Sequence, residues 1–265
     1  MSETIAGTPP PDRRPVRSST TSLEIVAESF SLLGQSLTTR WDVWLLAAIF
    51  FTSTNIVDIV FAPPGNPFHS PLMVASLIIR VVANVWAVTA AARVLTMSGR
   101  VWAIDLPLLR CTGAFVALIV LSLVLMVIAK HVIVNPVIAA MTQVTHATHR
   151  ALVVFTGVWL IGFAIVTVRL SAWLVALAIG DRAMDFSAAW RGMQGANLAA
   201  IGALIWTSPV PIGHLVLTSQ AQDLRGPFQV ALTVIDGLVS VLQVMLMMAM
   251  AAVLYRFASN NKPAP

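Results

Sequence analysis

Three ionisable side chains stand inside otherwise apolar stretches of this sequence, and they are its strongest candidates for chemistry. They are Asp58, Arg80 and Asp236. Counted from the apolar segments that begin at Leu72 and Phe228, Arg80 and Asp236 each lie eight residues in, which is about 12 Å along a helix. An unpaired charge at that depth in a membrane costs at least about 2.5–3.5 kcal/mol. We therefore expect Arg80 to face Asp236 or Asp58.

Two roles fit such a cluster. Ionisable groups inside a membrane form proton relays and substrate sites. An ion pair can equally serve only to fix the order of the helices that carry it. The sequence leaves both roles open and favours the structural one.

Three histidines raise the question of a metal site. His131, His146 and His149 lie together between two apolar stretches, and the last two are spaced to share one helix face. Zinc sites use histidines in this way, usually with a cysteine or a carboxylate. No acidic residue occurs between Asp105 and Asp181. We therefore predict no metal site and no cofactor.

Two prolines interrupt the fifth apolar stretch. Pro209 and Pro211 remove backbone donors there, and His214 follows within one turn. Broken helices line the sites of some transporters. A simple kink is the commoner result of a proline in a span, and we favour it here.

Signatures of catalysis are missing from the sequence. It has no nucleophile elbow, no phosphate-binding loop and no metalloprotease motif. The three glutamates all precede residue 29, so hydrolysis by paired carboxylates is not expected. We predict a protein without catalytic activity of its own.

The composition defines the class of protein. Of 265 residues, 58% are hydrophobic and 10% are charged, whereas a soluble domain carries about 25% charged residues. The mean hydropathy is +0.86. The net charge of +5 is explained by basic loops on one side of a membrane, so we predict no nucleic-acid partner. Cys111 is the single cysteine and should pack as a small apolar residue.

Hydropathy divides the chain into six apolar segments, each near the roughly 20 residues that a spanning helix needs. We therefore predict an all-α membrane protein with one six-helix membrane domain over residues 21–257, and with short interfacial amphipathic helices on the cytoplasmic side. The predicted spans are 41–61, 72–97, 113–134, 151–172, 197–218 and 228–255.

The parts outside the spans are predicted from their polarity. Residues 1–20 are polar and rich in Pro, Ser and Thr, which is typical of a disordered tail, and residues 258–265 form a second tail. Over residues 22–38, apolar positions recur at helical spacing behind a capping-box pair, Thr21 and Glu24. A one-sided helix just before a span predicts a helix lying in the membrane interface. Its apolar positions are Leu23, Val26, Phe30, Leu33 and Leu37.

The basic residues indicate the orientation. Of the 16 Lys and Arg residues, Arg80 lies within a span, and Lys130, Arg150 and Arg225 fall on the far side if the N-terminus is inside. The remaining twelve then lie on the cytoplasmic side. The positive-inside rule therefore predicts that both termini are cytoplasmic.

The segment after the fourth predicted span carries a recognisable motif. It reads Val-Arg-Leu-Ser-Ala from 168, Phe-Ser-Ala-Ala-Trp-Arg from 186 and Gly-Ala-Asn from 195. It resembles a family of bacterial six-span inner-membrane proteins of unknown activity, related to the membrane domain that some glycerophosphodiester phosphodiesterases carry before their catalytic domain. The matching positions are Arg169, Ala189, Trp190, Gly195 and Asn197.

The chain departs from this family in two places. The family often has a proline where this chain has Val-Ala-Leu at 175–177, and Ala196 is inserted between the glycine and the asparagine. The resemblance implies the six-span architecture and a place in a bacterial inner (plasma) membrane, but no reaction. We expect the motif residues to be structural.

A scaffold or accessory subunit that acts on lipids or on a membrane partner is the function we expect. The alternative is a small transporter with an intramembrane Arg/Asp site, and an enzyme of lipid metabolism comes third. A transporter needs a polar cavity lined by the charged residues, whereas a scaffold does not. The sequence specifies neither a ligand nor an oligomeric state.

Overall fold

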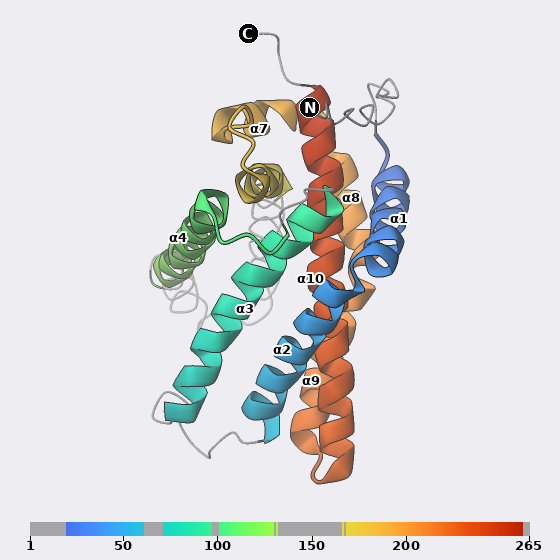
Figure 1. Cartoon of the computed structure of the whole chain (residues 1–265). Coiled ribbons are helices and arrows are strands. Elements are labelled where there is room, and N and C mark those ends of the chain that lie inside the picture. The colour runs from blue at the N-terminus through green and yellow to red at the C-terminus, as the bar shows by residue number, and fades with distance from the viewer. Residues whose placement is uncertain are drawn as a thin grey trace, which may run out of the picture.

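The computed structural model describes residues 20–60, 71–96, 101–129, 131, 166 and 168–261, and every regular element among them is helical. Figure 1 shows their arrangement. An apolar helical segment, Val168–Ile179, precedes the C-terminal half. The labelled helices are α1 (Ser22–Thr39), α2 (Trp41–Val60), α3 (Pro71–Leu95), α4 (Leu106–Ala129), α7 (Phe186–Gly192), α8 (Asn197–Thr207), α9 (Pro209–Asp223) and α10 (Pro227–Asn260).

Four helical segments are long and apolar enough to cross a membrane: Trp41–Ile59, Pro71–Leu95, Asn197–Asp223 and Pro227–Asn260. The prediction of an all-helical, multi-pass membrane protein is confirmed at this level. Most of the predicted span at 151–172, and residues 1–19 of the predicted tail, lie outside the described residues. The described part of the span at 113–134 belongs almost entirely to α4.

Helix α10 is the centre of the fold. It packs most extensively against α2 and α9, and also against α1, α3 and α7, and it runs along the length of the molecule in Figure 1. Buried residues occur along it from Gln229 to Ala258. The helix continues to Asn260, so residues 258–260, which were predicted as the start of the C-terminal tail, are helical.

Two glycines allow other elements to approach α10 closely. A Cβ added at Gly237 of α10 would lie 2.7 Å from the Cα of Thr52 in α2. A Cβ added at Gly192 of α7 would lie 2.6 Å from the carbonyl oxygen of Ala258. Helix association in lipid depends on such close van der Waals packing between small residues.

The first helix begins as the sequence predicts, since Thr21 and Glu24 form the expected capping box. Of its predicted apolar stripe, Leu33 is buried, whereas Leu23, Phe30 and Leu37 are about half exposed or more. Helix α1 contacts α8 and α10, and its buried residues are Ile25, Ser29, Leu32, Leu33 and Ser36. These serines can be buried because each donates to a carbonyl of its own helix.

The prolines of the fifth stretch lie at the start of α9. Ser208 separates α8 from α9 but keeps helical backbone angles, φ −57° and ψ −25°, and its carbonyl accepts from the N–H of Ile212. Pro209 occupies the first turn of α9, where its missing donor costs little. The backbone therefore stays helical between α8 and α9, and the kink at the prolines stays a prediction.

Replacing Gly237 by alanine should destabilise the protein. The added methyl group meets the backbone of α2, which cannot rotate away, and overpacking of this kind costs about 1–3 kcal/mol. Thermal unfolding in detergent measures the change. Gly113→Ala in α4 is the matched control, because nothing lies within 4 Å of its added Cβ. Equal behaviour of the two variants would show that α2 and α10 are not in close contact.

Candidate functional site

Arg80 of α3 forms an ion pair with Asp58 of α2. The distance from Arg80 Nη2 to Asp58 Oδ2 is 2.5 Å, and Ser76 Oγ donates to Asp58 Oδ1 at 2.6 Å. Both charged side chains are about one quarter to one third exposed. The expectation that Arg80 faces one of the two aspartates is confirmed for Asp58.

Asn55 separates Arg80 from the second aspartate. Arg80 Nη2 donates to Asn55 Oδ1 at 2.9 Å, and Asn55 Nδ2 donates to Asp236 Oδ2 at 2.9 Å. The amide therefore accepts from the cation and donates to the carboxylate. Sequence reasoning missed Asn55, although its position three residues before Asp58 puts the two on one helix face.

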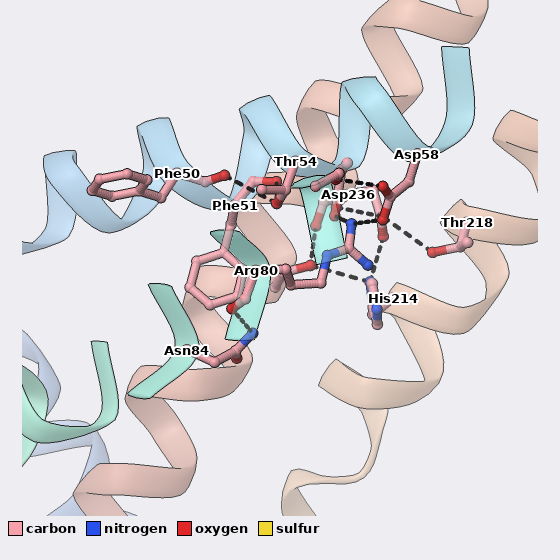
Figure 2. Close-up of polar contacts among 12 residues, drawn as sticks. Phe50, Phe51, Thr54, Asp58, Arg80, Asn84, His214, Thr218 and Asp236 are labelled. Carbon is pink, nitrogen blue, oxygen red and sulfur yellow. Dashed lines mark hydrogen bonds and ion pairs between the residues drawn. The ribbon is translucent and has the colours of Figure 1, made fainter. Parts of the chain in front are cut away.

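Asp236 is almost completely buried in α10, with a side-chain exposure of 1%. Its Oδ1 lies 2.6 Å from His214 Nδ1, and its Oδ2 accepts from Thr218 at 3.0 Å. Ser240 Oγ lies 3.2 Å from the same histidine nitrogen and donates to the Asp236 carbonyl. Figure 2 shows His214 and Thr218 extending from α9 toward Asp236, and the side chains of Arg80 and Asp58 are drawn in the same view.

These contacts connect four helices into one polar network. Each helix contributes two residues at a spacing of three or four, which places both on the face toward the others. The network comprises Asn55 and Asp58 of α2, Ser76 and Arg80 of α3, His214 and Thr218 of α9, and Asp236 and Ser240 of α10.

The charges of the network can be balanced by one proton. It contains one arginine and two aspartates, and His214 is charged only when protonated. A proton held between His214 and Asp236 would make the whole network neutral. Arg80 Nε is buried and has no hydrogen-bond partner among the described residues. Chemically, the network can hold helices together and can take up or release a proton.

Two cavities in the described part of the chain are lined by residues outside this network. One, of about 220 Å³, lies against α1, Arg40 and the end of α3. The other, of about 610 Å³, is lined mainly by apolar residues of α2, α3 and α4. No network residue lines either cavity. The charged residues therefore pair with one another and do not line these two spaces.

A second buried charge, Arg93, was expected only as a basic residue on the cytoplasmic side. Its side chain is 2% exposed. It donates to the carbonyls of Ala178 at 2.8 Å and Ala103 at 2.7 Å, and it pairs with Asp105 at 2.5 Å. Asp105 also accepts from the N–H of Leu108 at the start of α4. Arg93 thus joins the end of α3, the turn before α4 and the apolar segment Val168–Ile179.

The motif residues of the resemblance converge around α7. The Arg169 guanidinium lies 4.4 Å from the centre of the Trp190 ring and donates to Asn197 Oδ1 at 3.1 Å. Ala189 is buried. Gly195 has a φ of 90°, a conformation that glycine adopts without strain, and α8 begins two residues later. These contacts are consistent with a structural role.

The described residues include His131 but not the other two histidines that lie between the third and fourth predicted spans. Among the described residues, no group of three or more His, Cys, Asp or Glu side chains is arranged to hold a metal ion. His146 and His149 lie outside the described residues. Cys111 is buried and is not in a disulfide.

Comparison with known proteins gives no match: no family model, curated protein or solved structure is similar to this chain. The resemblance to the family of six-span inner-membrane proteins therefore stays a prediction.

Replacing Asp236 by alanine should lower the stability of the membrane domain. Asn55, Thr218 and His214 would lose their shared acceptor, and each buried polar group left without a partner costs about 1–3 kcal/mol. Thermal unfolding in detergent measures the loss. Asp223→Ala is the control, because Asp223 is exposed at the end of α9. If Asp236→Ala unfolds at the same temperature as the control, the network does not hold the helices together.

Proposed function

We propose that this chain is a six-span protein of a bacterial inner membrane, with both termini in the cytoplasm and without catalytic activity of its own. It serves as a scaffold or accessory subunit that contacts lipids or a membrane-protein partner. Its relation to the membrane domain of glycerophosphodiester phosphodiesterases is part of the same proposal.

The observation that carries this proposal is the internal pairing of the polar network. Asp236 is 1% exposed and meets three polar side chains, while Arg80 is paired with Asp58. A substrate site needs polar groups directed at an open space, and the two described cavities are bordered by other residues. Since removing one partner of a buried charged pair is strongly destabilising, such a network is well suited to fix helix order.

The surfaces available for a partner lie on α1 and α7. Leu23, Phe30 and Leu37 are exposed on α1, and Phe186 is exposed on α7. In Figure 1 both helices lie at the end of the molecule where α10 finishes, and the pair Arg256–Glu28 ties that end of α10 to α1. Exposed apolar side chains on these two helices support a contact with lipid headgroups or with another protein.

A photo-crosslinking amino acid at Phe30 should capture a protein partner in native membranes. The expected result is one adduct of defined mass on a denaturing gel, because α1 exposes an apolar face there. The same probe at Ile212 is the control, since this residue is similarly exposed on α9 but lies in a candidate span. It should yield lipid adducts only. Lipid adducts at both positions would contradict a protein partner at α1.

A small transporter is the second candidate, and the pair His214–Asp236 favours it. His214 is 30% exposed while Asp236 is 1% exposed, so a proton taken up at the histidine can pass to a buried carboxylate. The pair also lies beside the proline-containing span of α8 and α9. Proton relays in membrane proteins use such chains of His and Asp side chains.

Vesicles with an imposed pH gradient distinguish the two candidates. Under the proposed function, vesicles that contain the protein should lose the gradient no faster than protein-free vesicles, because the network only holds helices together. A pH-sensitive dye inside the vesicles measures the decay. Faster decay that His214→Gln abolishes and Asp223→Asn leaves unchanged would contradict the scaffold function and support the transporter function.

A further inference from the structure

An apolar cavity of about 610 Å³ lies between α2, α3 and the start of α4. Its walls include Phe50 of α2, Ile79 and Val82 of α3, and Leu108 of α4. Ligand sites in proteins commonly have volumes of about 300–1,000 Å³. Ile79 and Val82 are about half exposed or more, so the cavity opens at the surface of the helices.

The cavity is long enough to cover an acyl chain across one leaflet of a bilayer. Its lining residues on α3 run from Ile78 to Arg93, which is about 22 Å of helix at 1.5 Å per residue. The hydrocarbon of one leaflet is half of a core about 30 Å thick, or about 15 Å. An acyl chain lying along α3 would therefore be covered over most of its length.

A more polar cavity of about 220 Å³ shares the residue Val101 with the apolar one. Gln35 and Thr39 of α1 line it together with Arg40. The Arg40 guanidinium lies 5.7 Å from the centre of the Trp102 ring, and Trp102 lines the apolar cavity. The pair of Arg40 and Trp102 thus marks the point where the two cavities meet. Tryptophan and arginine side chains are both typical of the headgroup level of a membrane.

The charges at this junction sum to zero. Arg40 Nε and Nη2 donate to the Asp42 carboxylate at 3.0 and 2.9 Å, and these bonds raise the pKa of Arg40. Arg40 Nη1 has no hydrogen-bond partner among the described residues, and a guanidinium group is suited to bind phosphate oxygens. The Asp42 side chain is 39% exposed and can accept from an ammonium group. A headgroup with one phosphate and one amine complements this pair better than an anionic headgroup.

We propose that the two cavities together bind one molecule of a zwitterionic glycerophospholipid with a primary amine. An acyl chain occupies the apolar cavity, the phosphate binds Arg40 Nη1, and the amine binds Asp42. This inference rests on the proposed function and deepens it, because it names the lipid class that the accessory subunit would hold. The polar network takes no part in it.

Native mass spectrometry of the delipidated full-length protein tests this site. The probe is an equal mixture of phosphatidylethanolamine and phosphatidylglycerol. We expect the first lipid bound to favour phosphatidylethanolamine by about tenfold, the effect of one charged contact. Asp42→Asn should remove that preference, since Arg40 would then carry an uncompensated charge.

A pair of tryptophan variants tests the position of the acyl chain. Val82→Trp fills the apolar cavity from an exposed position and should weaken binding of the first lipid by about tenfold. Leu45→Trp is the matched control, because Leu45 is also exposed but lines neither cavity. Equal binding by the two variants, or no headgroup preference in the wild type, would overturn the proposal and indicate ordinary surrounding lipid.

A measurement on the wild-type protein keeps the test independent of variant folding. Phosphatidylethanolamine with a photoreactive acyl chain should label residues 78–93 and 101–108 preferentially. Even labelling of exposed apolar residues on all helices would overturn the site. The crosslink at Phe30 is read separately. If the partner adduct is retained but lipid selectivity is absent, only the proposed lipid site is contradicted. If the adduct is lost but lipid selectivity is intact, only the proposed protein partner is contradicted.

Discussion

A carboxylate buried in an apolar helix must be surrounded by groups that interact with it, and Asp236 imposes this requirement on the whole bundle. It is 1% exposed, and its partners Asn55, Thr218 and His214 come from two other helices. Asn55 in turn contacts Arg80, which is held by Asp58. Because hydrocarbon supplies no hydrogen bonds, α2, α3, α9 and α10 can satisfy these groups only by packing in one arrangement.

Close packing around α10 adds van der Waals attraction between helices to the polar contacts. In lipid, burying apolar surface provides little driving force for helix association. Van der Waals packing between small residues, which let the backbones approach closely, therefore carries much of the attraction. Gly237 against Thr52 and Gly192 against Ala258 provide such contacts, the first about a third of the way along α10 and the second at its C-terminal end. Arg93 adds a buried link between α3, the turn before α4 and the segment Val168–Ile179. The proposed lipid site lies beside this link, where α3 and the start of α4 leave space between them.

The charged residues of this structure have different roles. Arg80 and Arg93 are held by partners within the bundle, and Arg169 is stacked on Trp190. Arg40 differs in position, since it lies between α1 and α2 and lines the smaller, more polar cavity. A scaffold that fixes its helices internally and offers one basic group at the headgroup level is consistent with a protein that holds a lipid for a membrane partner.

The sequence by itself determined the class of protein, because 58% hydrophobic residues in helix-length runs have few solutions other than membrane helices. It also indicated α2, α3 and α10, the capping box at Thr21 and the pairing of Arg80, since each follows from local spacing or from the cost of a buried charge. Only the tertiary structure decided that Asp58 pairs with Arg80, that Asn55 bridges to Asp236, that Arg93 is buried and that the buried face of α1 includes two serines. These outcomes depend on which helix faces meet and how closely, and that is fixed by contacts between residues far apart in the chain.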